Sequence, residues 1–252
     1  MADGESERYQ ALLRFEKEFH GPIWDWVVNK VETEEGEKGY AGIKDPEHLE
    51  ILDISEDSSV FSQLLAEKYK VKRLACAVRD ETQHVRLRHN VEIHKIKLKD
   101  ETCGDLKHLG KFDIIILKEV LYEVPNLELF FTELKHNLKD QNSMLFIFSR
   151  PKNPPLPIPD TAMVAWRKMA PTREEIIEVT KKTGWELDCF SASCPIKIKK
   201  HDWGAILRSG CIPAIKNSPK CTLKEIRDFV ETRSSPTWAF EEKILIFKVW
   251  LA

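Results

Sequence analysis

Side chains that can take part in chemistry accompany two of the apolar runs in this sequence. Asp53 lies within the run Leu49 to Ile54. The run Phe112 to Leu117 is followed by Glu119, Tyr122 and Glu123. Carboxylates and a phenol can hold an amine or a hydroxyl through hydrogen bonds. Structural roles are the alternative, because Asp53 could cap a following helix and Tyr122 could pack in the core.

Patterns that mark other kinds of chemistry are missing from the sequence. It contains no G-x-S-x-G nucleophile motif, no P-loop and no C-x-x-C pair. His84, His89 and His94 are spread over a helical segment and the next apolar run, without an i, i+4 pair supported by a carboxylate. We therefore predict no metal site, and no catalytic nucleophile can be assigned.

The segments that must position these residues alternate between strand-like and helix-like spacing of their apolar residues. Apolar runs of strand length are separated by segments with helical spacing. The strand-like runs are Leu49 to Ile54, Arg73 to Val78, Val91 to Leu98, Phe112 to Leu117, Met144 to Ser149, Trp185 to Ile198 and Lys243 to Leu251. This alternation predicts an α/β fold with a seven-stranded, mostly parallel sheet, helices on both faces and an antiparallel last strand. Pro195 should interrupt the sixth strand near its end.

Helix caps and loops define the rest of the organisation. Thr172 with Glu175 forms a capping-box pattern, and Thr222 with Glu225 repeats it. Gly184 should end the first of these helices. Five prolines between residues 151 and 159 predict an extended loop.

We expect residues 1–46 to form an N-terminal helical segment and linker, and residues 47–252 to form the main domain. About forty residues with helical pieces lie between the last two predicted strands, which is longer than a hairpin needs. This insertion predicts a lid from about Lys199 to Glu241.

Composition limits the possible partners and the compartment. Lys and Arg number 39 against 41 Asp and Glu among 252 residues, so the net charge of -2 gives no overall attraction for phosphate backbones or acidic membranes. We therefore expect neither nucleic acid nor a membrane among the partners. Six cysteines without metal spacing, and an N-terminus without the regions of a signal peptide, predict reduced thiols in a cytosolic or nuclear protein, and we expect a cytoplasmic one. The small basic patch Lys197, Lys199, Lys200 and His201 is interpreted as ordinary surface.

Two strings resemble class I S-adenosylmethionine (SAM)-dependent methyltransferases. Residues 49–54, Leu-Glu-Ile-Leu-Asp-Ile, are similar to the family's first strand, and residues 112–126 are similar to its fourth strand and following loop. The similarity covers roughly residues 47–198. Trp203 and the helix near Thr222 also resemble the small-molecule branch, which has a lid between strands six and seven. The resemblance implies a Rossmann-like fold, SAM as cofactor and a small-molecule substrate.

The turn after the first strand departs from the family's pattern. The family has D-x-G-x-G-x-G there, because the backbone must approach the cofactor without a Cβ in the way. In this sequence Ser55, Asp57 and Ser59 occupy the glycine positions. Asp57 also adds a carboxylate near the place of the cofactor's own carboxylate, which is an unfavourable like-charge contact. We therefore expect weak or absent binding of SAM.

The resemblance also implies which residues line the site. On the cofactor side these are Asp53, Ser55, Asp57, Asp80, Asp100, Lys118 and Glu119. Asp80 stands two positions after the usual ribose acceptor, and Asp100 either accepts from an adenine amino group or belongs to a solvated face. On the substrate side they are Tyr122, Glu123, His201, Trp203 and Arg208. A tryptophan at such a position is alternatively a core anchor.

Two functions follow from the resemblance. The first is methylation of a small molecule, which needs mainly alignment of the acceptor, the methyl group and the leaving sulfur, so an obvious base is not required. The second is a catalytically inactive pseudo-methyltransferase that keeps the sheet and serves as a binding or scaffold module, for example for a protein partner. The net charge disfavours a nucleic-acid-binding member of the family.

Overall fold

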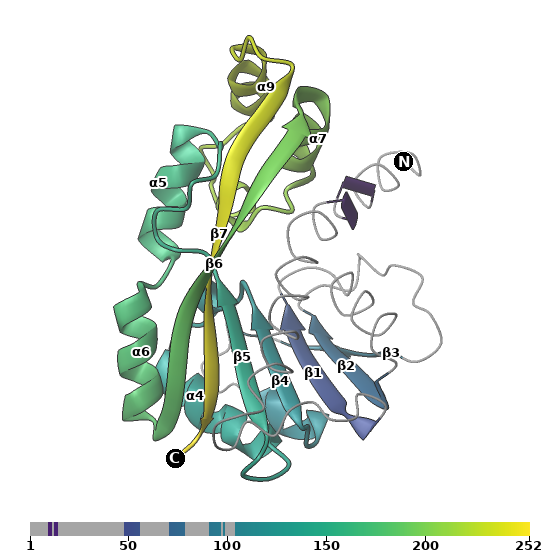
Figure 1. Ribbon diagram of the computed structural model, residues 1–252, viewed down its shortest axis with the longest axis vertical. Helices are drawn as coiled ribbons and strands as arrows, with labels where there is room; N and C mark the ends of the chain where they lie inside the picture. Colours follow the sequence, from purple (N-terminus) through teal and green to yellow (C-terminus); the bar gives the residue numbers. More distant parts are fainter. Residues whose placement is uncertain are drawn as a thin grey trace. The chain divides into compact units, whose positions relative to one another are not determined.

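The seven predicted strands form one mixed sheet in this computed structural model, in the order β3-β2-β1-β4-β5-β7-β6 (Figure 1). The structure describes residues 10, 11, 13, 14, 48–55, 71–78, 91–96, 98 and 104–252. Of the predicted N-terminal helical segment, residues 10, 11, 13 and 14 are described, and they are helical. The rest of that segment and the positions of Asp57, Ser59, Asp80 and Asp100 lie outside the described residues. The strands are β1 (Glu50–Ser55), β2 (Arg73–Val78), β3 (Val91–Lys95), β4 (Ile114–Lys118), β5 (Met144–Ser149), β6 (Trp185–Lys199) and β7 (Thr237–Leu251).

Helices connect and cover the later strands. They are η4 (Gly104–Leu109), η5 (Leu121–Glu123), α4 (Leu127–Leu134), η6 (Lys135–Asn137), α5 (Asp160–Met169), α6 (Arg173–Lys182), α7 (Lys200–Ser209), α8 (Pro213–Lys216) and α9 (Leu223–Glu231). Strands β1 to β5 pair in parallel, whereas β7 runs antiparallel to β5. The predicted fold class is therefore confirmed, including the antiparallel last strand and the helical insertion between β6 and β7.

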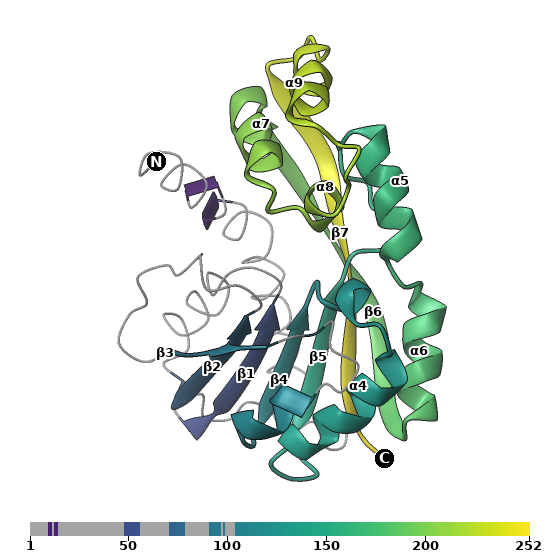
Figure 2. The same ribbon diagram turned by 180° about the vertical axis from the view of Figure 1, so that it is seen from behind.

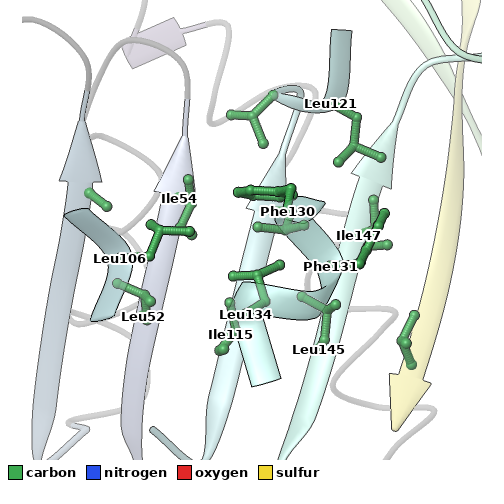
Figure 3. Packing of buried hydrophobic residues seen from close by; sticks show 14 of the residues in the cluster. Leu52, Ile54, Leu106, Ile115, Leu121, Phe130, Phe131, Leu134, Leu145 and Ile147 are labelled. Carbon is green, nitrogen blue, oxygen red and sulfur yellow. The ribbon is translucent and has the colours of Figure 1, made fainter. Parts of the chain in front are cut away.

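The central strands are apolar on both sides because they are buried on both faces of the sheet. Every residue of β4 is buried, and so is every residue of β5. On one face, alternate side chains of β1, β4 and β5 pack against Phe130, Phe131 and Leu134 of α4 (Figure 3). Their spacing along α4 puts all three on one side of the helix, and this packing holds the strand ends in place.

The predicted helix caps are confirmed. The Thr172 hydroxyl accepts a hydrogen bond from the Glu175 backbone N–H at 3.1 Å, and the Glu175 carboxylate accepts one from the Thr172 N–H at 2.6 Å. Thr222 likewise accepts from the Glu225 N–H at 3.2 Å. The Glu225 carboxylate accepts from the Thr161 hydroxyl at 2.8 Å, so the cap at Thr222 is formed without the reciprocal bond of a capping box. Gly184, with a φ of 76°, follows α6 in the left-handed region. The proline-rich segment forms no helix or strand between residues 151 and 159, as predicted.

Pro195 does not interrupt β6, so this prediction is wrong. Strand β6 runs without a break from Trp185 to Lys199 and lies at the edge of the sheet, next to β7 alone. A proline is compatible with an edge strand, where its missing N–H faces away from the ladder.

Strand β7 begins six residues before the predicted start at Lys243. Within the added part, Trp238 and Glu242 are buried, whereas Ala239 and Glu241 are exposed. This is the two-residue period of a strand. A buried glutamate breaks the apolar pattern from which the prediction was made, which explains the late start.

The chain divides into two compact units. The sheet unit comprises Trp24–Ser149, Pro171–Ser191 and Leu245–Ala252. The insertion unit comprises Met1–Ile23, Arg150–Ala170 and Ala192–Ile244, and therefore contains the predicted lid. Within the insertion unit, α7 and α9 lie beside the paired ends of β6 and β7 (Figures 1 and 2).

Two further findings concern the described residues alone. None of their helices combines the length and apolar character that crossing a membrane requires. The five cysteines within the described ranges form no disulfide.

Candidate functional site

Three of the predicted cofactor residues meet at the carboxyl ends of β1 and β4. Ser55, the last residue of β1, pairs in register with Lys118, the last residue of β4. Because side chains alternate along a strand, Asp53, Ser55 and Lys118 share one face of the sheet. This face is opposite to the one that carries the core residues Leu52 and Ile54. The carboxyl edge of a parallel sheet is where ligands of such folds bind.

These side chains are buried, and two of them bond to each other. Asp53 is 0% exposed, Ser55 3% and Lys118 7%. The Ser55 hydroxyl donates a hydrogen bond to Asp53 Oδ1 at 2.8 Å. The first of the three positions that carry glycine in the resembled family is therefore filled by a buried hydroxyl bonded to the preceding aspartate.

Glu119 has a special backbone conformation next to this cluster. Its φ is 55°, and within the described ranges no other residue except glycine has a positive φ. The Glu119 N–H donates to the Phe148 carbonyl of β5 at 2.9 Å, which holds the turn after β4 in place. Side chains with a Cβ are strained in the left-handed region, and such strain concentrates at functional sites.

A pair of substitutions at residue 119 should measure this strain. Glu119→Gly and Glu119→Ala both remove the carboxylate, but only glycine adopts a positive φ without a Cβ clash. We expect the glycine variant to be more stable than the alanine variant by about 1 kcal/mol, from urea denaturation followed by circular dichroism. Equal stabilities of the two variants would show that the turn relaxes on substitution.

The predicted substrate-side residues of the sheet unit follow the same turn. Tyr122 and Glu123 lie in the short helix η5, directly after β4. Glu123 is 7% exposed, and Tyr122 is half-buried. The loop after β4 thus brings a carboxylate and a phenol to the carboxyl end of the strand that carries Lys118.

The predicted lid residues belong to the insertion unit and differ in their surroundings. The His201 side chain is 87% exposed, and its Nδ1 lies 3.5 Å from an Asp202 carboxylate oxygen. Arg208 is exposed in the last turn of α7. Trp203 is fully buried, and its Nε1–H donates to the Pro157 carbonyl at 2.9 Å. Trp203 therefore has the surroundings of a core anchor, the alternative considered from the sequence.

One buried ionic contact was missed by the sequence interpretation. Arg150 Nε lies 3.0 Å from Glu242 Oε1, and the two side chains are 2% and 0% exposed. Arg150 directly follows β5, and Glu242 lies in the early part of β7. The two residues are 92 positions apart. No local sequence pattern pairs residues at such a separation.

Comparison with known proteins finds similarity in structure alone. No family profile matches the chain, and no curated protein matches its sequence. A candidate methyltransferase from Bacillus halodurans matches with a TM-score of 0.50 and 14% identity, over 88% of this chain and 97% of that one. The YcgJ protein from Bacillus subtilis matches with a TM-score of 0.53 and 12% identity, over 83% and 94%. The [4+2]-cyclase SpnF matches with a TM-score of 0.52 and 11% identity, over 90% and 81%.

The order of the strands together with these matches decides the fold. The chain has the class I methyltransferase fold. At 11–14% identity the matches show the architecture and not the reaction. The function of this methyltransferase-fold protein must therefore be argued from its own side chains.

The described part of the carboxyl edge of the sheet fits SAM poorly. A methionine moiety lying along the end of β1 needs close contact with the backbone. At Ser55 it would instead meet a buried side chain that is bonded to Asp53. The other two substituted glycine positions, Asp57 and Ser59, lie outside the described residues.

Proposed function

We propose that this methyltransferase-fold protein is a pseudo-methyltransferase, which binds SAM weakly and serves as a binding or scaffold module. The observation that carries the proposal is the buried hydrogen bond between Ser55 and Asp53 at the end of β1. At a position where the family has glycine, this chain has Ser55, whose hydroxyl already donates a hydrogen bond to Asp53. A ligand that displaced this hydroxyl would leave the Asp53 carboxylate short of a donor, which costs binding free energy.

Methylation of a small molecule is the second candidate function. It is favoured by the strained conformation of Glu119, because such strain persists where the surrounding structure builds a ligand site. In this function Tyr122 and Glu123 would orient an acceptor amine or hydroxyl. The fold is compatible with both functions, because one fold can host different activities. One of the similar structures, for example, is named as a cyclase.

Titration of the full chain with SAM and S-adenosylhomocysteine tests the proposal. Calorimetry should show no saturation at micromolar ligand, and the melting temperature should stay unchanged. A ligand present at 100 times its dissociation constant would add about 2.7 kcal/mol of stability, so binding would be evident. Tight micromolar binding by the unaltered chain would contradict the proposal and favour the methyltransferase.

A matched pair of triple variants identifies the cause of weak binding. Ser55→Gly, Asp57→Gly and Ser59→Gly together should strengthen SAM binding by at least about tenfold, because the backbone becomes accessible. The same three positions changed to alanine lose the hydroxyls and the carboxylate but keep a Cβ. We expect the alanine variant to improve much less. Equal improvement in both variants would assign the defect to polarity and charge and not to the Cβ atoms.

A further inference from the structure

The net charge of -2 conceals a strong separation of charge between parts of the chain. Residues 150–170 and 192–244, which we call the basic module, carry 14 Lys and Arg against 7 Asp and Glu, a net charge of +7. The whole basic module belongs to the insertion unit. All remaining residues together carry 25 Lys and Arg against 34 Asp and Glu, a net charge of -9. The expectation that the protein does not bind nucleic acid was based on the net charge of the whole chain. That value describes neither the basic module nor the remaining residues.

The positive charge of the basic module lies at its surface. Arg150 is its one buried cation within the described structure, and it is paired with buried Glu242. This pair removes one charge of each sign, so the excess of +7 is carried by exposed and half-buried side chains. Charge in this position attracts polyanions, and the attraction weakens as salt rises.

Cations from β6, from α7 and from the segment after α9 come together at one end of the basic module. Lys197 and Lys199 are exposed and alternate in β6 with buried Ile196 and Ile198, so both lysines stand on the outer face of the strand. The next residue along the chain, Lys200, opens α7.

The third segment of this cationic end directly follows α9 (Leu223–Glu231) and carries Arg233. Lys200 Nζ donates to the carbonyls of Glu231 and Arg233 at 3.2 and 2.6 Å, at the C-terminal end of α9. Arg233 itself is exposed, and its guanidinium lies 4.7 Å from the centroid of the Trp238 ring. Lys200, which begins α7, therefore lies beside Arg233, 33 residues further along the chain.

Several acidic side chains of the basic module are engaged within the insertion unit. Asp202 accepts a hydrogen bond from Arg14 at 2.6 Å. Glu225 accepts one from the Thr161 hydroxyl at 2.8 Å, and Glu242 is held by Arg150. These carboxylates are directed at protein donors, and their charge is partly screened from an approaching polyanion.

The aromatic and apolar side chains decide which polyanion fits. Trp166, Trp203 and Trp238 are buried, so they provide no exposed ring on which a base could stack. The large apolar residues that are strongly exposed in the described structure are Val164 and Leu223, too few for the apolar face that inserts into a membrane.

We propose that the basic module binds the sugar-phosphate backbone of a nucleic acid without reading its sequence. Lysine and arginine contacts to phosphates supply affinity and strong salt dependence, whereas base contacts supply specificity. This proposal goes beyond the scaffold role and is independent of SAM binding, because the residues that carry it belong to the insertion unit.

Fluorescence anisotropy of the full chain with a labelled 20-nucleotide RNA of mixed sequence tests the proposal. If about five phosphates are contacted, log K should fall with log salt with a slope of about -3.5. A second RNA of unrelated sequence should bind within about twofold of the first. Absence of binding at low salt, binding insensitive to salt, or a large sequence preference would overturn the proposal.

Charge-reversal variants locate the binding surface. Lys197→Glu with Lys199→Glu should weaken RNA binding by at least about tenfold at 0.1 M salt. The matched control is Lys111→Glu with Lys181→Glu, two exposed lysines of the sheet unit that change the total charge equally. The control should weaken binding by less than about threefold. Equal losses in the two variants would overturn the assignment to the basic module.

A second variant and two other polyanions complete the test. Lys220→Glu with Lys224→Glu changes exposed lysines elsewhere in the basic module and should also weaken binding, so the result does not depend on one variant folding. Polyglutamate and phosphatidylserine vesicles are titrated in parallel. Tighter binding of either one than of the RNA would overturn the choice of nucleic acid as the partner.

Discussion

Replacing Glu242 by alanine should lower the free energy of unfolding of the insertion unit by about 3–5 kcal/mol, because it leaves the Arg150 guanidinium buried without its carboxylate. The two side chains are 2% and 0% exposed, with 3.0 Å between Nε and Oε1. At such burial, water cannot replace the lost partner. Urea denaturation followed by tryptophan fluorescence measures the change.

Two controls separate the ion pair from simple loss of packing. The double variant Arg150→Met with Glu242→Leu removes both charges and keeps apolar volume, so we expect it to lie within about 1–2 kcal/mol of the unaltered chain. Lys182→Ala breaks an exposed pair with Glu128, whose side chains are 63% and 52% exposed, and should cost less than about 1 kcal/mol. A small effect of Glu242→Ala, similar to that of Lys182→Ala, would contradict the prediction.

Replacing Trp203 by alanine should also cost about 3–5 kcal/mol. Trp203 is 0% exposed, its ring centroid lies 5.0 Å from that of Phe240, and its indole N–H is bonded to the Pro157 carbonyl. Truncation therefore opens a large cavity and also leaves a carbonyl without its donor. The melting temperature and urea midpoint of the variant measure the cost.

The controls for Trp203 separate its packing from its hydrogen bond. Trp203→Phe keeps most of the apolar volume, and we expect a cost of about 1–3 kcal/mol, from the lost hydrogen bond and the smaller ring. Leu223→Ala, at a side chain that is 66% exposed, should change stability by less than about 0.5 kcal/mol. A Trp203→Ala variant as stable as Leu223→Ala would rule out the core-anchor role and restore Trp203 as a candidate for substrate contact.

The charge distribution changes how a net charge should be used in assigning partners. A net charge of -2 for the whole chain disfavoured nucleic-acid binding as long as the chain was treated as one unit. Association depends on the local field at the docking surface, within about one Debye length of roughly 10 Å. Once the insertion unit is recognised as a separate compact unit, its local charge becomes the relevant quantity. The whole unit carries 17 Lys and Arg against 12 Asp and Glu, a net charge of +5, and its basic module, residues 150–170 and 192–244, carries +7.

Much of the fold was predictable because its signals are local. The bounds of β2 and β5 agree with the predicted runs Arg73 to Val78 and Met144 to Ser149. Apolar runs between helical segments identify buried parallel strands without knowledge of their partners. The caps Thr172 and Thr222 were equally predictable, since each cap lies three residues before the backbone N–H that donates to it.

The predicted site was readable only in part. The resemblance placed Asp53, Ser55, Lys118 and Glu119 together, because strand order puts the ends of β1 and β4 side by side. It did not show that the Ser55 hydroxyl bonds to Asp53, nor that Glu119 has a φ of 55°. Both features depend on how neighbouring strands hold the backbone, and a polar residue type alone does not specify them.

By itself, the sequence determined the succession of strands and helices along the chain, the helix caps, the departure from the glycine-rich turn and the helical insertion. All of these follow from residues close together in the chain. The tertiary structure decided the features that depend on distant partners. Pro195 fits within β6 because that strand has become an edge, and Glu242 is buried because Arg150, 92 positions away, neutralises it. Edge position and buried pairing arise only when the chain has folded, so they leave no local signal in the sequence.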